Sequence, residues 1–225
     1  MIKSALALHH TGFPLVLAAP SGAGKTSIAH RLGELRPDID FSISCTTRQP
    51  RAGERNGVDY HFVNEAGFEE MIAAGDLMEW ARVHGHLYGT PRSNLEEARV
   101  RRHLLLLDID VQGSRQVKRA VPEAVSIFIL PPDAEELVRR LTGRGSEEPA
   151  VRQRRLAAAR DELRSAGEFD YVVVNDNLDR AVAEVNTILD AEMARASRLE
   201  NLPHRIGDLV TGLENSLGPV VDGYQ

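Results

Sequence analysis

The residues best suited to chemistry form a glycine-rich segment near the N-terminus. It consists of Ala19, Pro20, Ser21, Gly22, Ala23, Gly24, Lys25, Thr26 and Ser27. Glycines let backbone N–H groups turn inward around a phosphate, and the helix that follows adds a partial positive charge at its N-terminus. Lys25 can reach the β- and γ-phosphates of a nucleotide, and the Thr26 hydroxyl can ligate Mg²⁺. The segment therefore predicts an ATP-binding phosphate loop.

The first position of this loop departs from the usual pattern, which begins with glycine and here begins with Ala19. Alanine disfavours a positive φ angle. We therefore expect Ala19 either to adopt an ordinary backbone conformation or to distort the loop slightly. The alternative for the whole segment is a strand–helix turn that binds no nucleotide, but Gly24, Lys25 and Thr26 stand where the phosphate-binding pattern requires them.

Arginines gather in two further segments. Arg48 and Arg51 lie in a loop stiffened by proline and glycine, which indicates a site for a fixed anion rather than a solvated loop. Arg140 and Arg144 are four residues apart, so both can project from one face of a helix, and Arg155 lies in the next predicted helix. In a chain with a formal net charge of -6, two arginine-rich segments suit a small, multiply charged anion better than a polymer.

Two carboxylates follow a run of four leucines. Asp108 ends the run, and Asp110 lies two residues later. Such a run is typical of a parallel strand buried on both faces, and acidic residues at its C-terminal end lie at the ligand edge of the sheet. Asp108 is therefore a candidate carboxylate near Mg²⁺, acting through water. Asp110 is either a second site residue or the N-cap of a helix over Val111–Ala120.

The elements that carry these residues alternate between strand and helix at both ends of the chain. The predicted strands are Phe13–Ala18, His103–Asp108, Val125–Leu130 and Tyr171–Val174, and the predicted helices are Thr26–Leu35, Asp133–Leu141, Val151–Ser165 and Asp179–Arg198. This alternation predicts an α/β fold with a parallel sheet covered on both faces. Residues 40–102 break the alternation with short strands and loops, including a predicted strand over Val58–Val63, and indicate an inserted lobe.

The segment Ser42–Phe62 carries a longer pattern. It reads SISCTTRQPRAGERNGVDYHF and closely resembles the guanylate kinase family, whose run has the form S-x-S-x-T-T-R-x-P-R-x-G-E-x-x-G-x-D-Y-x-F. The resemblance extends over about Pro14–Glu192. It implies a P-loop three-layer parallel-sheet core (residues 13–39, 103–138 and 169–198), an inserted nucleotide-monophosphate-binding lobe (residues 40–102) and a helical lid (residues 139–168). Residues 199–225 extend beyond the resemblance, which gives them no role.

The same resemblance implies roles for single residues. GMP would be bound by Ser44, Arg48, Arg51, Tyr60, Glu79, Tyr88, Thr90 and Asp110. The catalytic cations would be Lys25, Arg48, Arg140, Arg144 and Arg155, with Thr26 and Asp108 at the magnesium ion. Glu79 matches the family's guanine-reading glutamate, because a carboxylate can accept from guanine N1–H and N2–H₂ together, whereas adenine would leave it unpaired. Asn175 and Asp176 match a region near the adenine of ATP.

The activity that the resemblance implies is transfer of the γ-phosphate of ATP to GMP, and to dGMP, giving ADP and GDP by direct in-line phosphoryl transfer in purine nucleotide metabolism. A P-loop kinase for another nucleoside monophosphate is an alternative that Glu79 and the segment Arg48–Tyr60 disfavour. A catalytically silent guanylate-kinase-like interaction module is a second alternative, which Lys25, Thr26 and the lid arginines disfavour. Mg²⁺-dependent binding of ATP would separate a kinase from such a module.

Composition limits the class of protein. Of the 225 residues, 42% are hydrophobic and 27% are charged, which is typical of a folded globular protein. The net charge of -6 disfavours nucleic acids and membrane surfaces as partners, because both are anionic. Cys45 is the only cysteine, and no apolar run is long enough to span a bilayer, so we expect a cytoplasmic protein. Both a monomer and a homo-oligomer fit the sequence.

Overall fold

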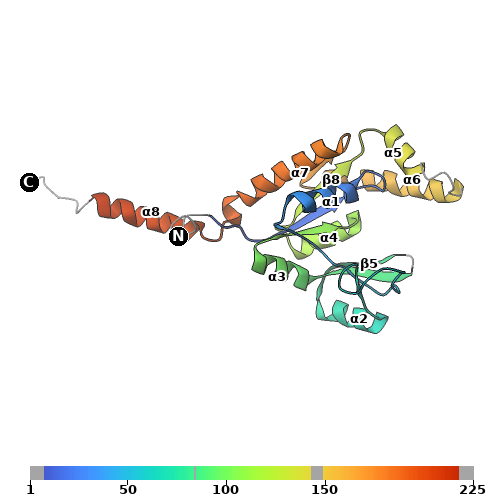
Figure 1. Ribbon diagram of the computed structural model, residues 1–225, viewed down its shortest axis with the longest axis horizontal. Coiled ribbons are helices and arrows are strands. Elements are labelled where there is room, and N and C mark those ends of the chain that lie inside the picture. The colour runs from blue at the N-terminus through green and yellow to red at the C-terminus, as the bar shows by residue number, and fades with distance from the viewer. Residues whose placement is uncertain (1–7, 84, 143–148, 218–225) are drawn as a thin grey trace, which may run out of the picture. The chain divides into compact units, whose positions relative to one another are not determined.

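The computed structural model describes residues 8–83, 85–142 and 149–217, and Figure 1 shows its elements. The chain divides into two compact units. One unit comprises Gly12–Ile188, and the other comprises Met1–Thr11 together with Leu189–Gln225. The first unit contains both β-sheets, and every residue with a predicted site role belongs to it.

The strands and helices follow the predicted alternation closely. The strands are β1 (Pro14–Ala18), β2 (Ile39–Phe41), β3 (Cys45–Thr46), β4 (His61–Phe62), β5 (Leu77–Val83), β6 (His86–Pro91), β7 (Leu104–Asp108), β8 (Val125–Leu130) and β9 (Tyr171–Val174). The helices are α1 (Lys25–Leu35), α2 (Glu65–Ala74), α3 (Arg92–Arg101), α4 (Val111–Ala120), α5 (Ala134–Thr142), α6 (Pro149–Leu163), α7 (Leu178–Met193) and α8 (Leu202–Leu217), with 3₁₀ turns at Ala166–Glu168 and Ala196–Arg198.

A five-stranded parallel sheet forms the centre of the first unit, in the order β2-β7-β1-β8-β9. Its middle strands β7, β1 and β8 are almost entirely buried, which explains why their sequences are continuous apolar runs. Leu17 of β1 is the register partner of Asp108 in β7. This register places the carboxyl end of β7 beside the loop that follows β1. Asp108 therefore lies next to the phosphate loop.

Helices cover both faces of this sheet. Leu105 and Leu107 pack in one cluster with Leu95 of α3 and Val117 of α4. The alternate leucines of β7 are also buried and point to the opposite face, where α1 and α7 lie (Figure 1). The three-layer arrangement confirms the predicted α/β fold class, with a parallel sheet as its core.

A second sheet of four strands has the order β4-β3-β6-β5, and all of its strands lie between β2 and α3 in the chain. Its small core is formed by Cys45, Phe68, Leu77 and Leu87. Burial raises the pKa of the Cys45 thiol to about 11, so this side chain serves packing rather than nucleophilic chemistry. The predicted strand Val58–Val63 is wrong in length, because the Asp59 N–H bonds to the Arg55 carbonyl in a turn and only His61–Phe62 forms β4.

The second unit contains the end of α7 and all of α8. His10 and Leu199 form an antiparallel bridge, and Glu192 forms a buried ion pair with Arg198 at 2.9 Å. The predicted helix Asp179–Arg198 is therefore too long: α7 ends at Met193, and the chain turns so that Arg198 can reach back to Glu192.

Helix α8 carries a stripe of exposed apolar side chains. They are Ile206, Leu209, Val210, Leu213 and Leu217. They lie three, four, seven and eleven residues after Ile206, a spacing that places them on one side of the helix. Across the described ranges of the chain, no helix is both long enough and apolar enough to cross a membrane.

Candidate active site

The phosphate loop connects β1 to α1 and has the backbone conformation that its glycines permit. Gly22 and Gly24 have φ angles of 87° and 90°, in the left-handed region that side chains disfavour. Among the non-glycine residues that the structure describes, Arg102 alone has a positive φ angle. Ala19 therefore adopts an ordinary backbone conformation, and its replacement of the usual first glycine introduces no backbone strain.

Asn175 follows β9 and holds the phosphate loop. Its side chain is buried, and its Nδ2 donates to the Ala23 carbonyl at 2.8 Å. A Cβ atom at Gly24 would lie 2.3 Å from the same nitrogen. Gly24 is therefore required both by its φ angle and by its contact with Asn175, a side-chain role that sequence reasoning did not assign to this asparagine.

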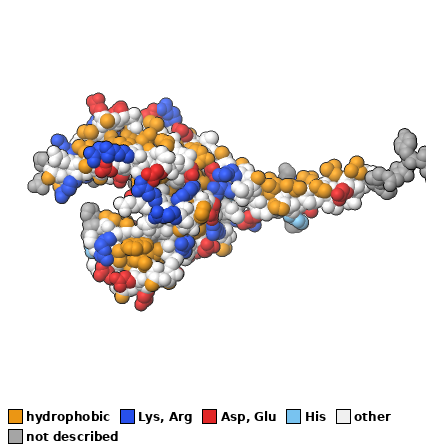
Figure 2. All heavy atoms as spheres, turned by 180° about the vertical axis from the view of Figure 1, so that it is seen from behind, with side chains coloured by type: hydrophobic (Ala, Val, Ile, Leu, Met, Phe, Trp, Pro, Cys, Tyr) orange, Lys and Arg blue, Asp and Glu red, His pale blue; other side chains and the backbone are white. Residues whose placement is uncertain are grey.

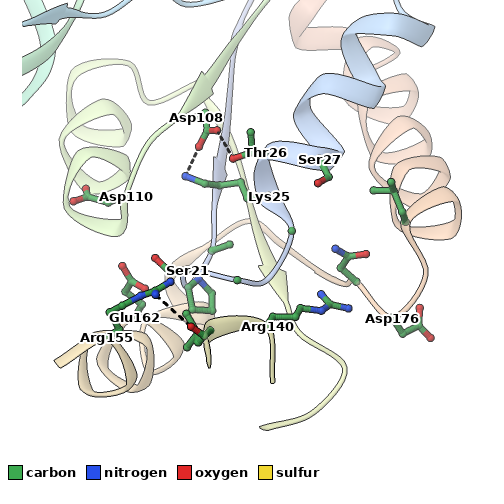
Figure 3. Close-up of a pocket in the computed structure, with 17 residues that line it drawn as sticks. Ser21, Lys25, Thr26, Ser27, Asp108, Asp110, Arg140, Arg155, Glu162 and Asp176 are labelled. Atoms are coloured by element: carbon green, nitrogen blue, oxygen red, sulfur yellow. Dashed lines mark hydrogen bonds and ion pairs between the residues drawn. The ribbon is translucent and has the colours of Figure 1, made fainter. Parts of the chain in front are cut away.

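Asp108 contacts both Lys25 and Thr26 of the phosphate loop. Its carboxylate forms an ion pair with Lys25 Nζ and accepts from the Thr26 hydroxyl at 3.2 Å (Figure 3). Lys25 also donates to the Ile109 carbonyl at 2.8 Å. Charge-assisted contacts of this kind fix geometry more strongly than neutral ones. The residues predicted for the phosphates and for magnesium thus form one connected group.

A cavity of about 820 Å³ adjoins this group. It is lined by Ala19, Pro20, Ser21, Gly22, Gly24, Lys25, Thr26, Ser27, Asp108, Asp110, Arg140, Leu141, Arg155, Glu162, Asn175, Asp176 and Leu178. Ala23 is the one predicted ATP-binding residue that does not line this cavity, and its side chain is fully buried. Figure 2 shows Lys and Arg side chains gathered along a hollow in the surface of the first unit.

Arg140 reaches over the phosphate loop from α5. Its Nη1 lies 3.9 Å from the position of a Cβ atom at Gly24, and its Nε donates to Glu136 at 2.6 Å. Hydrogen bonds from Arg139 and Arg140 lower the pKa of the Glu136 carboxyl to about 2, so it stays ionised. The neighbouring Arg139 binds the same carboxylate, but its side chain is 71% exposed. Glu136 thus directs Arg140 toward the cavity and leaves Arg139 in solvent.

A second of the predicted catalytic arginines comes from α6. Arg155 lines the cavity, and its Nη1 donates to the Leu141 carbonyl at 3.2 Å. The structure therefore brings Arg140 and Arg155 to the phosphate loop from two different helices. Arg144 lies outside the described residues.

Glu162 is a cavity residue that sequence reasoning missed. It lies on α6 seven residues after Arg155, which places both side chains on one face of the helix. Its carboxylate lines the same cavity as Ser21 of the phosphate loop. Burial raises the pKa of Glu162, and the nearby charge of Asp110 adds to the shift. The spacing from Arg155 places Glu162 on the same helix face, but no sequence pattern indicates that it reaches the phosphate loop.

Arg48 is held in place on the four-stranded sheet. Its two terminal nitrogens donate to both carboxylate oxygens of Glu54 at 2.9 and 2.8 Å, and its guanidinium lies 5.4 Å from the centroid of the Tyr60 ring. Tyr60 and Tyr88 pack edge to face, with 6.0 Å between ring centroids. Glu54 also accepts from the backbone N–H of Arg51 at 2.7 Å, while Arg51 itself is exposed. Glu54, to which sequence reasoning gave no role, therefore organises the predicted acceptor-phosphate loop.

Glu79 is a buried carboxylate on β5, only 7% exposed. Its Oε1 accepts from the Thr90 hydroxyl at 2.6 Å. Burial raises the pKa of Glu79; the Thr90 hydrogen bond opposes this shift, and the charge of Asp110 reinforces it. Asp110 caps α4, because its Oδ1 accepts from the Gly113 N–H at 2.8 Å, so the N-cap interpretation of Asp110 is confirmed. Its predicted contact with the guanine stays a prediction.

A smaller pocket of about 190 Å³ lies on the acceptor side. Its lining includes Ser44, Tyr60 and Thr90, all of them predicted acceptor residues, together with Asp108. Asp108 also lines the larger cavity. The two spaces therefore share one carboxylate, with the phosphate loop on one side and the predicted acceptor residues on the other.

Comparison with known proteins identifies related sequences and structures. The sequence model of the family described as guanylate kinase matches residues 11–192. The chain is 50% identical over 190 residues to the guanylate kinase of Myxococcus xanthus (84% of this chain, 91% of that protein) and 50% identical over 202 residues to that of Syntrophotalea carbinolica (90% and 96%). The crystal structure of guanylate kinase from Anaplasma phagocytophilum matches with a TM-score of 0.70 at 35% identity, covering 89% of this chain and 96% of that one.

The substitution Gly24→Ala tests the geometry of the phosphate loop. The new Cβ would meet Asn175 at 2.3 Å and would force alanine to a φ angle of 90°. We expect ATP affinity to fall at least about tenfold, because the loop must shift to relieve the clash. Titration calorimetry with ATP and Mg²⁺ measures the loss.

Gly75→Ala is the matched control for this variant. Gly75 has a φ angle of 73° at the end of α2, and an added Cβ would meet nothing within 4 Å. It should lower the free energy of unfolding by about 1–3 kcal/mol through backbone strain alone and leave ATP affinity unchanged. Equal ATP affinity in the two variants would contradict the assigned role of Gly24.

Proposed function

The chain belongs to the guanylate kinase family, and we propose on this basis that it transfers the γ-phosphate of ATP to GMP, and to dGMP, giving ADP and GDP. The carrying observation is that Asp108 lines both the phosphate-loop cavity and the pocket of Ser44, Tyr60 and Thr90. A donor in the first space and an acceptor in the second would meet beside one carboxylate. This geometry supports direct in-line transfer between two bound nucleotides.

On the donor side, the backbone N–H groups of the phosphate loop and Lys25 would bind the ATP phosphates. Within the described part of the chain, no group of three or more His, Cys, Asp or Glu side chains could hold a metal ion by itself. The hydroxyl of Thr26 and the carboxylate of Asp108, 3.2 Å apart, are oxygen ligands of the type Mg²⁺ prefers alongside phosphates and water. These two residues would hold the ion, which neutralises phosphate charge when bound.

On the acceptor side, Arg48, Arg51, Tyr60 and Tyr88 would bind the phosphate of GMP. The Glu54 carboxylate holds the Arg48 fork and the Arg51 backbone in one loop, which pre-organises this phosphate site. Ser44, Thr90 and Asp110 would contact the base. Glu79 would accept from guanine N1–H and N2–H₂, and burial makes an unpaired carboxylate costly when adenine is bound instead.

The transferred group would be stabilised by cations from the lid. We assign residues 139–168 as the lid and residues 40–102 as the acceptor lobe, both joined to the parallel-sheet core of residues 13–39, 103–138 and 169–198. Arg140 and Arg155 already face the phosphate loop from α5 and α6. Phosphoryl transfer depends on positioning and charge stabilisation rather than on a covalent enzyme intermediate. The sequence also provides Arg144 for this set.

The cellular setting follows from the substrates. Phosphorylation of GMP and dGMP by ATP belongs to purine nucleotide metabolism, and we place it in the cytoplasm. The formal net charge of -6 supports small nucleotides, rather than nucleic acid or a membrane, as partners.

An acceptor screen tests the proposed reaction. Production of ADP from ATP and Mg²⁺ is measured with GMP, dGMP, AMP, CMP or UMP supplied separately. We expect strong stimulation by GMP and dGMP only, since the other three bases lack the paired N1–H and N2–H₂ donors that Glu79 accepts. Stimulation by a different monophosphate would replace the proposed acceptor, and stimulation by none of them would favour an interaction module.

The variant Glu79→Gln extends the screen. A neutral amide cannot accept from both guanine donors, so kcat/KM for GMP should fall and the preference for GMP over AMP should narrow by on the order of 10²-fold or more. In the unaltered protein, the KM for GMP should rise as the pH falls through the pKa of Glu79, which burial raises above 4.5. This acid-side rise should be smaller in Glu79→Gln, where the phosphate of GMP still titrates in this range; an equal rise there, or full GMP selectivity, would contradict the assignment.

Arg140→Ala and Arg139→Ala form a matched pair, because both arginines bind Glu136 and only Arg140 lines the cavity. Arg140→Ala should lower kcat, because it removes about 2–4 kcal/mol of transition-state stabilisation, a value typical for one fixed charge stabiliser. Arg139→Ala should leave kcat unchanged, because its charge is solvated. Steady-state kinetics at saturating ATP and GMP measure both, and equal kcat values for the two variants would remove Arg140 from the catalytic set.

A further inference from the structure

The outer edge of the four-stranded sheet is hydrogen-bonded by a side chain of the parallel-sheet core. β5 is the last strand of that sheet, so one of its edges has no strand neighbour within the part of the chain that the structure describes. The Trp80 N–H donates to Gln116 Oε1 at 3.1 Å, and Gln116 Nε2 donates to the Trp80 carbonyl at 2.9 Å. The Gln116 amide therefore satisfies the two backbone groups that a further strand would bind. This contact joins β5 of the lobe to α4 of the parallel-sheet core.

The same face of α4 also contacts Glu79, the residue before Trp80. A Cβ atom at Gly113 would lie 3.0 Å from Glu79 Oε2, so the missing side chain of Gly113 leaves room for this carboxylate. Asp110, Gly113 and Gln116 are spaced three residues apart, which places them on one face of the helix. Helix α4 thus seats the Glu79 carboxylate at Gly113 and fixes the adjacent backbone through Gln116.

We propose that Gln116 is a positioning residue for purine selection. It fixes the backbone of β5 next to Glu79, so that the Glu79 carboxylate can accept from both guanine donors. This inference rests on the proposed function, because it requires Glu79 to be the purine selector. Gln116 acts through the backbone of Trp80 and does not itself contact the nucleotide. Without it, Thr90 still holds Glu79 Oε1 and Met78 of β5 still packs against Val117 of α4, but the Trp80 backbone beside Glu79 loses both of its hydrogen bonds to α4. The carboxylate then loses the fixed position that accepting from two guanine donors at once demands.

The test compares the unaltered protein with the variant Gln116→Met. This substitution keeps the length of the side chain and removes both hydrogen bonds to Trp80. Gln112→Met is the matched control, because it makes the same change at an exposed position of the same helix. The acceptors are GMP, AMP and inosine monophosphate, which keeps N1–H and lacks the 2-amino group. Steady-state kinetics give kcat and KM for each acceptor, and thermal unfolding gives Tm.

We expect Gln116→Met to raise the KM for GMP about tenfold, because a displaced Glu79 carboxylate makes weaker hydrogen bonds to the two guanine donors. The preference for GMP over inosine monophosphate should fall by a similar factor, while kcat and the KM for ATP stay unchanged. In a Glu79→Gln background, Gln116→Met should no longer alter this preference, because the two residues act as one unit. Gln112→Met should match the unaltered protein in every parameter.

An unchanged preference in Gln116→Met, with or without a lower Tm, would overturn the proposal and leave Gln116 a purely structural role. A change in preference that persists in the Glu79→Gln background would overturn it as well. If the unaltered protein does not prefer GMP over AMP, the proposed function itself fails. Should Gln116→Met not fold, Gln116→Asn replaces it, because its shorter amide cannot reach both Trp80 groups. A lower preference for GMP over inosine monophosphate in Gln116→Asn would support the proposal, and an unchanged preference would overturn it.

Discussion

The contact between Asp108 and Lys25 is the interaction on which the rest of the site depends. It exists because the parallel register of β1 and β7 pairs Leu17 with Asp108 and so places a carboxylate beside the loop that follows β1. The same carboxylate accepts from Thr26, so the ammonium and the hydroxyl share one anchor. The side chains of Lys25 and Asp108 are 18% and 35% exposed, so both remain open to a ligand from the cavity. The position of the proposed ATP site thus follows from the order and register of β1 and β7.

In the proposed function, acceptor selection depends on a different physical quantity, the free-energy cost of burying charge. Glu79 is a carboxylate with little access to water, and burial raises its pKa. Such a group is tolerated when hydrogen bonds compensate it, and Thr90 provides one of them. A base that offers two donors supplies the remaining compensation, whereas adenine does not. Selectivity of this kind would require a fixed position of the carboxylate, a role that we assign to α4 through Gly113 and Gln116.

The sequence predicted those cavity residues that can be recognised from local patterns. Lys25 and Thr26 follow from the glycine spacing, Asp108 from its place after a leucine run, and the parallel sheet from the alternation of apolar strands and helices. Contacts between elements distant in the chain could not be predicted in this way. Glu162 reaches the phosphate loop from α6, and Gln116 reaches β5 from α4, and neither carries a motif.

Some errors of the sequence analysis have the same origin. The end of α7 was missed because the buried Glu192–Arg198 pair, which turns the chain, cannot be recognised from helical periodicity. The single measurement that tests the central claim most directly is a single-turnover reaction with [γ-³²P]ATP, Mg²⁺, GMP and excess protein, quenched over time. The account predicts that label passes from ATP to GDP at the rate of turnover, with none on the protein. Label on the protein, or release of inorganic phosphate without labelled GDP, would contradict direct transfer between two bound nucleotides.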